Sequence, residues 1–280
     1  MIIWIASYPK SGNTWVRAFL SAYYFTENGI FDPNKLKLIE DYPNKTLFAE
    51  NHNIKYGEIY KFWNLSQKKI LKDKKVRFFK THNALLKVFD REFTSPKYTL
   101  GTIYVVRDPR NVITSLKNHY DFPSYEVALK FMLHKENYIW GQNNDYAKSQ
   151  IISSWNINYI SWVKKNNYNR ILIKYEDLIL NPENTFRQLI LFTNKILKQN
   201  KDINEEKLKN AISTTNFESM KKVEKDGQFD EKMRSEKTDK YKDFFFLGPK
   251  NDWKKLLDKN TIKSINENFS EELKDLNYEV

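Results

Sequence analysis

Short apolar segments that favour β-strands alternate along the chain with segments whose apolar residues recur at helical spacing. The strand-like runs cover residues 2–6, 76–79, 102–106 and 171–174. The helical patterns cover residues 15–23, 109–120, 151–164 and 182–190. Strands that alternate with helices predict an α/β fold with a central parallel sheet flanked by helices. Ligands of such folds gather at the carboxyl ends of the strands.

The residues between these segments are typical of helix starts and support the same division. Asp108-Pro109 and Asn181-Pro182 each place a capping residue before a proline at the first helical position. Thr14 or Asn13 is the candidate cap of the first helix. The highly charged stretch 221–242 predicts a mobile loop or lid. No repeat and no domain boundary is visible, so we expect one domain over residues 1–280.

The composition excludes several classes of protein. The chain has no cysteine, which excludes disulfides, Cys-ligated metals and a cysteine nucleophile. Mean hydropathy is −0.71, and no stretch resembles a membrane span or a signal peptide. We therefore expect a soluble, cytoplasmic protein without membrane insertion. The net charge of +12 suggests an anionic partner, although a surface rich in lysine would give the same value.

The turn after the first strand carries the groups that bind an anion. Lys10, Ser11, Gly12, Asn13 and Thr14 bring an ammonium, hydroxyls and backbone N–H groups to the start of a helix. Walker-type loops require glycine immediately before the lysine, and this chain has proline there. The pattern therefore predicts a phosphate-binding loop of another kind, with an ordinary strand-to-helix turn as the alternative.

The run from Tyr8 to Trp15 (YPKSGNTW) closely resembles the 5′-phosphosulfate-binding loop of sulfotransferases that use 3′-phosphoadenosine 5′-phosphosulfate (PAPS). The resemblance implies that the cofactor is PAPS, and that Lys10, Ser11, Gly12, Asn13 and Thr14 hold its phosphosulfate. The commonest cytosolic form has threonine in place of Asn13. An asparagine side chain also donates and accepts hydrogen bonds, so the change is compatible with that role.

A second segment, YVVRDPRNV from residue 104, is similar to the 3′-phosphate-binding segment of this family. The resemblance implies that Arg107 and Ser115 bind the 3′-phosphate. The planar guanidinium of Arg107 suits a phosphate, and Ser115 would add a hydroxyl from the following helix. The alternative for Arg107 is a surface ion pair with Asp108 or another neighbour.

The segment FFKTH, residues 78–82, resembles the end of the strand that carries the family's catalytic residues. The resemblance implies that His82 is the base for the acceptor and that Lys80, with Lys10, stabilises the charge of the transferring group. A histidine titrates near neutrality, as a general base requires, and fixed ammonium groups stabilise developing negative charge. An isolated histidine would more often be a hydrogen-bonded structural residue.

Later segments match in the family's order. If they are carried over, Trp15 and Phe217 would sandwich the adenine, while Tyr175 and Thr215 would reach its polar edge. Leu247 and Gly248 would offer backbone groups, but Phe246-Leu247 replaces the usual Arg-Lys pair. Compensating charge would then come from one of three candidates, Lys250, Lys242 or Arg234. For Trp155 and Trp162 core packing is the preferred interpretation.

The resemblance implies a metal-independent, PAPS-dependent sulfotransferase that acts on a hydroxyl or amine of a small molecule. The acceptor and the oligomeric state stay open. One alternative is a P-loop-type nucleotide or small-molecule kinase, which predicts dependence on Mg²⁺ and ATP but is disfavoured by Pro9. The other is a nucleic-acid-binding protein, which is disfavoured because the aromatic residues lie within apolar strand and helix patterns.

Overall fold

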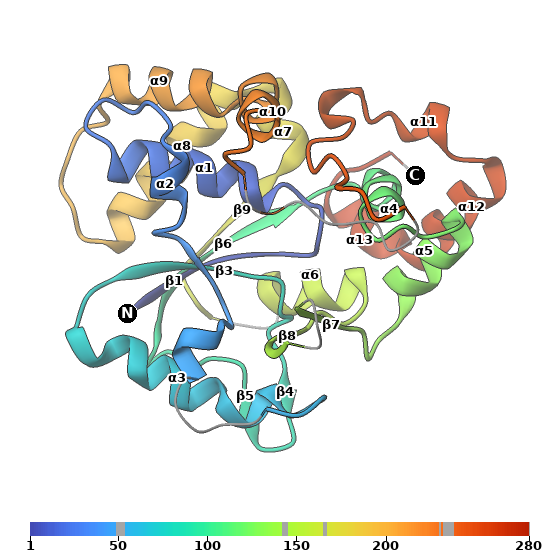
Figure 1. Cartoon of the computed structure of the whole chain (residues 1–280), viewed down its shortest axis with the longest axis horizontal. Coiled ribbons are helices and arrows are strands. Elements are labelled where there is room, and N and C mark those ends of the chain that lie inside the picture. Colours follow the sequence, from blue (N-terminus) through green and yellow to red (C-terminus); the bar gives the residue numbers. More distant parts are fainter. Residues whose placement is uncertain (49–53, 142–144, 165–166, 230, 232–237, 280) are drawn as a thin grey trace.

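The computed structural model describes residues 1–48, 54–141, 145–164, 167–229, 231 and 238–279. Its centre is a parallel sheet with the strand order β2-β3-β1-β6-β9 (Figure 1). The strands are β1 (Ile2–Ser7), β2 (Glu40–Asp41), β3 (Arg77–Thr81), β6 (Thr99–Val106) and β9 (Arg170–Lys174). Because they are parallel, their carboxyl ends lie at one edge, as the alternating sequence pattern predicts.

Two small antiparallel hairpins stand apart from this sheet. One pairs β4 (Lys87–Val88) with β5 (Arg91–Glu92), and the other pairs β7 (Tyr138–Gly141) with β8 (Asp145–Ile151). The predicted helix over 151–164 is therefore wrong at its start. Ile151 ends β8, Ser153 has a positive φ of 59°, and the helix begins only at Trp155.

Helices cover both faces of the sheet. The first half of the chain has α1 (Asn13–Phe25), α2 (Pro33–Leu36), α3 (Trp63–Ile70), α4 (Pro109–His119) and α5 (Tyr125–Leu133). The middle has α6 (Trp155–Val163), α7 (Tyr175–Leu180), α8 (Pro182–Ile196), α9 (Glu205–Thr215) and α10 (Phe217–Lys225). The last are α11 (Trp253–Leu256), α12 (Lys259–Asn268) and α13 (Ser270–Asp275). Short 3₁₀ turns cover Lys45–Phe48, Ile59–Phe62, Leu71–Asp73 and Gly248–Lys250.

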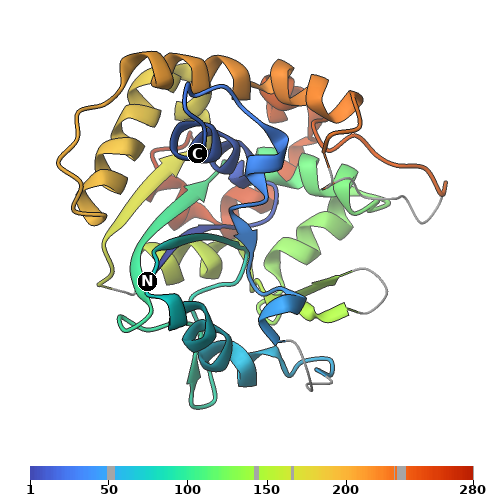
Figure 2. The same ribbon diagram turned by 60° about the vertical axis from the view of Figure 1, so that its left-hand side comes forward.

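Alternate residues of the central strand β1 enter two separate cores. Ile3 and Ile5 pack with α1, α8 and α9, which lie together on one side of the sheet (Figures 1 and 2). Ile2 and Trp4 pack with α4, α6 and the C-terminal helices on the other side. All six residues of β1 are buried, as expected for the middle strand of a parallel sheet that is covered on both faces.

The capping predictions have different outcomes. Asp108 caps α4 by accepting a hydrogen bond from the backbone N–H of Arg110, and Pro109 is the first residue of that helix. Asn181 precedes Pro182 at the start of α8, but its side chain makes no capping hydrogen bond. The prediction for α1 is wrong: the cap is Gly12, with φ 101°, and neither Asn13 nor Thr14 serves. Only glycine adopts that conformation without strain.

The prediction of a loop over 221–242 is wrong for residues 221–225, which form the last turns of α10. Residues 230 and 232–237 of that stretch, including Arg234, lie outside the described residues. Within the described ranges, no helix has both the length and the hydrophobicity needed to cross a membrane.

Candidate active site

A cavity of about 840 Å³ opens at the carboxyl ends of β1, β3 and β6. It is lined by every residue that the sequence predicted for the site except Ser11, which is fully buried beside it in the loop. The lining members of that set are Lys10, Gly12, Asn13, Thr14, Trp15, Lys80, His82, Arg107, Ser115, Tyr175, Thr215, Phe217, Leu247 and Gly248. Segments more than 200 positions apart in the sequence therefore share one cavity.

The loop between β1 and α1 is held in shape by its own residues. The side-chain amide of Asn13 donates to the Ile5 carbonyl at 3.0 Å and to Ser7 Oγ at 3.1 Å. A Cβ at Gly12 would lie 2.6 Å from the Tyr175 ring, so no larger residue fits there. Ser11 Oγ is buried and has no hydrogen-bond partner among the described residues. The loop is thus closely packed around a buried hydroxyl that no described residue satisfies.

Lys10 carries the ammonium group of this loop, and burial favours its neutral form. Its Nζ lies 3.7 Å from the centroid of the Phe244 ring, a cation–π contact. Burial lowers the pKa of Lys10 to about 7; the negative charge of Glu231 opposes this shift, and the positive charges of Arg107 and Lys80 add to it. A bound anion would favour the charged form and oppose this shift.

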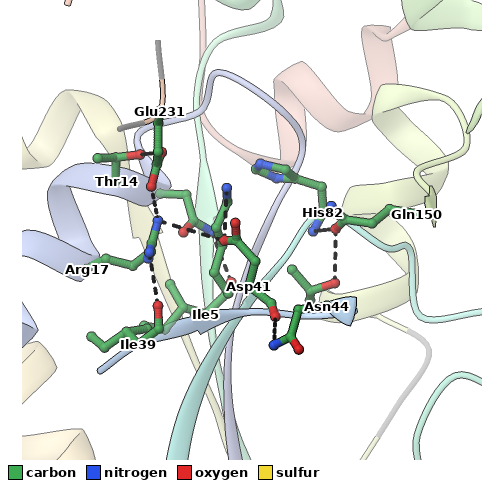
Figure 3. Close-up of polar contacts among 12 residues, drawn as sticks. Ile5, Thr14, Arg17, Ile39, Asp41, Asn44, His82, Gln150 and Glu231 are labelled. Atoms are coloured by element: carbon green, nitrogen blue, oxygen red, sulfur yellow. Dashed lines mark hydrogen bonds and ion pairs between the residues drawn. The ribbon is translucent and has the colours of Figure 1, made fainter. Parts of the chain in front are cut away.

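His82 has a fixed orientation at the end of β3. Its Nδ1 lies 2.8 Å from the carbonyl oxygen of Ser7. Its backbone N–H donates to Gln150 (Figure 3). Because a carbonyl only accepts, Nδ1 carries the proton and the lone pair is left on Nε2. Burial and the charge of Lys80 lower the pKa of His82 to about 3, so the ring is neutral at physiological pH. The tautomer is the one that a general base requires, but the expectation that His82 titrates near neutrality is wrong for the free protein, because burial and Lys80 disfavour the charged ring.

Lys80 lies beside a carboxylate that the sequence analysis did not identify. Its Nζ is 3.2 Å from Asp41, and Asp41 lies opposite Lys80 in the register of β2 and β3. The strand β2 contains only two exposed acidic residues, so no apolar run marks it in the sequence. Lys80 therefore forms an ion pair with Asp41 and is not an isolated cation.

Arg107 and Ser115 are brought together as the resemblance implies. The guanidinium donates to Ser115 Oγ at 3.2 Å and to the Lys10 carbonyl at 3.3 Å, and it lies over the Tyr175 ring at 4.1 Å. Arg107 Nε is buried and has no partner in the described part of the chain. The alternative of an ion pair with Asp108 is wrong, because Asp108 pairs with Arg110 at 2.8 Å.

The aromatic side chains predicted for adenine lie in the same cavity. Trp15 contacts Tyr175 edge-on, with 5.8 Å between ring centroids. Gly248 has φ 52°, and a Cβ there would lie 2.3 Å from Phe217. Thr215 is buried and its hydroxyl donates to the Ala211 carbonyl, so towards a ligand it can only accept.

The two described candidates for replacing the missing Arg-Lys pair are Lys242 and Lys250, and neither lines the cavity. Lys242 contacts Asp121 and donates to the Asn118 carbonyl at 2.5 Å. Lys250 is exposed and does not line the cavity.

Trp155 and Trp162 are 1% and 0% exposed and belong to the core, which confirms the core interpretation.

Three further polar residues of the site escaped the sequence analysis. Arg17 is buried in α1 and contacts Glu231, while His119 ends α4 and lines the cavity. Burial, together with Lys10 and Lys80, lowers the pKa of His119. Arg17 could have been found, because it is a cation among the apolar residues of the predicted helix. Nothing local marks Glu231, whose partners lie more than 200 residues away.

Comparisons with known proteins agree with this geometry. A family model described as a sulfotransferase domain matches residues 2–277. An amine sulfotransferase of Oryctolagus cuniculus is 24% identical over 281 residues, which span 98% of this chain and 81% of the relative.

Among solved structures, the mouse sulfotransferase SULT7A1 complexed with PAP has a TM-score of 0.60 at 20% identity, with 98% of this chain and 84% of that chain covered. A retinol dehydratase in complex with androsterone and the inactive cofactor PAP has a TM-score of 0.62 at 16% identity, with 98% and 81% covered. At these identities the structural likenesses establish the fold.

Proposed function

The chain belongs to the sulfotransferase family, and we propose that it transfers the sulfuryl group of PAPS to a hydroxyl or amine of a small-molecule acceptor. The observation that carries the proposal is the cavity in which Lys10, Lys80 and the free Nε2 of His82 come together. Similar proteins support the acceptor class: one is an amine sulfotransferase, and another binds androsterone.

The residues present fit this cofactor. Ser11 Oγ and Arg107 Nε are buried polar atoms without partners among the described residues. Such atoms are costly in a folded protein unless a ligand or water satisfies them. They belong to the two segments that the resemblance assigns to the phosphosulfate and the 3′-phosphate. We propose that the phosphate loop, Arg107 and Ser115 hold the two ends of PAPS, and that Trp15 and Phe217 hold its adenine.

In the proposed mechanism, PAPS would supply an activated sulfuryl group, whose sulfur would bond to the acceptor oxygen or nitrogen while its bond to the 5′-phosphate breaks and PAP leaves. His82 accepts the proton of the acceptor at Nε2, while the Ser7 carbonyl keeps the opposite nitrogen protonated. Lys10 and Lys80 place positive charge where the reaction develops negative charge. Positioning and electrostatics then provide most of the acceleration, by analogy with phosphoryl transfer. Metal independence stays a prediction from the family resemblance; within the described ranges no group of His, Cys, Asp or Glu has a metal-binding arrangement.

The kinase alternative is not favoured, since the family model is that of a sulfotransferase and Pro9 stands where a Walker loop needs glycine. The cytoplasmic location stays a prediction from the composition, as do the single domain over residues 1–280 and the absence of a nucleic-acid partner.

The proposal is tested by thermal unfolding with 3′-phosphoadenosine 5′-phosphate (PAP), and separately with ATP and Mg²⁺. A ligand at about 100 times its Kd adds about 2.7 kcal/mol to the free energy of unfolding. We expect PAP to stabilise the protein in the presence of a chelator. Stabilisation by Mg-ATP alone would favour the kinase, and no effect of either ligand would contradict the cofactor assignment.

A further inference from the structure

The hydroxyl of Thr14, which the phosphate loop would offer to the cofactor, donates its hydrogen bond to the carboxylate of Glu231. Glu231 Oε2 accepts a hydrogen bond from Thr14 Oγ1 at 3.0 Å, and Oε1 accepts one from Arg17 at 2.5 Å (Figure 3). A threonine hydroxyl has a single proton to donate. While Thr14 donates to Glu231, it cannot donate to a phosphate as well.

The carboxylate is held firmly by its surroundings. Arg17 is 4% exposed, and it also donates to the Ile39 carbonyl at 2.9 Å. Asp41 lies 4.0 Å from Arg17 and 3.2 Å from Lys80, so carboxylates and cations alternate from Glu231 to Lys80 beside the cavity. Although burial opposes ionisation, Lys80 and Arg17 hold the pKa of Glu231 well below its usual range. The group is therefore an anion at every physiological pH.

We infer that Glu231 is an internal anion of the phosphosulfate site, which competes with the cofactor for Thr14 and for the positive charge of the loop. This inference rests on the proposed function. Binding of the cofactor would exchange the hydrogen bond from Thr14 to Glu231 for one from Thr14 to a phosphate oxygen. The carboxylate would also repel the phosphate, since both are negative. Glu231 thus lowers the affinity of the site for its own cofactor.

The test is isothermal titration of PAP into the full-length protein and its Glu231→Gln variant. Glutamine keeps the length of the side chain and an oxygen that accepts from Thr14 but loses the charge, so this variant isolates the effect of the charge. We expect PAP to bind the variant about three- to tenfold more tightly, within the range of an ordinary net hydrogen bond. The matched control is Asp226→Asn, which removes the same charge from an exposed residue outside the cavity and should change the Kd less than twofold.

Equal or weaker binding of PAP by a folded Glu231→Gln variant would overturn the inference and make Glu231 a structural partner of Arg17. If that variant gives no cooperative unfolding transition, Glu231→Asp replaces it. The shorter carboxylate withdraws from Thr14, so tighter binding is again expected and weaker binding again overturns the inference. Failure of the wild type and all variants to bind PAP would instead overturn the proposed function, and this inference with it.

Discussion

At the scale of single residues, Lys10 links cofactor binding to pH. Its pKa of about 7 in the free protein means that a bound anion, which favours the charged form, makes the protein take up a proton above pH 7. The affinity for PAP should therefore fall as the pH rises from 7 to 9, by at most about tenfold per pH unit. Titration calorimetry at several pH values, in two buffers of different ionisation heat, measures both effects.

The control for this prediction is Lys10→Arg, because arginine stays protonated throughout the range. The variant should lose the decrease in PAP affinity between pH 7 and 9 even if its affinity differs from that of the wild type. A wild-type affinity that stays constant over this range would show that Lys10 is not the titrating group.

His82 gives a second prediction at this scale. Replacement of His82 by Ala should lower turnover with any acceptor found by screening at least ~100-fold, the low end for general base catalysis. PAP affinity should change little, because the assigned task is removal of the acceptor's proton. His134→Ala is the matched control, since His134 is exposed and outside the cavity. Full activity of the His82→Ala variant would refute the assignment.

At the scale of elements, α4 depends on the residue that begins it. Asp108 caps the helix and also neutralises Arg110, whose side chain is 1% exposed. Replacement of Asp108 by Ala removes the cap and leaves a buried guanidinium without its carboxylate, which should lower the free energy of unfolding by about 3–5 kcal/mol. Since α4 carries Ser115 and His119 into the cavity, PAP binding should weaken as well.

Asn204 provides the comparison, because it caps α9 at an exposed position by accepting from the backbone N–H of Lys207. Its replacement by Ala should cost about 1 kcal/mol, the usual effect of a lost cap. Urea unfolding of the two variants measures the difference. Equal losses would mean that Arg110 finds another partner when Asp108 is absent.

The elements also show which parts of the fold and of the site can be predicted from the sequence. The central strands are apolar because helices cover both faces of the sheet, so β1, β3, β6 and β9 were all predicted, with ends shifted by up to three residues. The strand β2 was missed because its side chains are exposed. The loop residues were found because their chemistry is local in sequence. The contact of Glu231 with Thr14 was not, because tertiary folding alone creates it.

At the scale of the whole molecule, the C-terminal segment completes the core on one side of the sheet. Phe269, Leu273 and Leu276 are at most 3% exposed and pack in the cluster that contains Ile2 and Trp4 of β1. Tyr278 donates to Glu176 at 2.7 Å, and the Leu276 carbonyl accepts from Lys174 at 2.7 Å. The segment is thus tied to the end of β9, close to the site.

Deletion of residues 269–280 should therefore prevent the protein from folding. Loss of one large buried side chain costs about 2–5 kcal/mol, and a domain has only about 5–15 kcal/mol in total. Deletion of residues 279–280 is the matched control, because Glu279 is exposed and its pair with Lys254 lies at the surface, where such pairs contribute little. Circular dichroism during heating should show a transition near that of the wild type for the short deletion and none for the long one. A cooperative transition in the long deletion would show that the sheet and its other helices form a core without this segment.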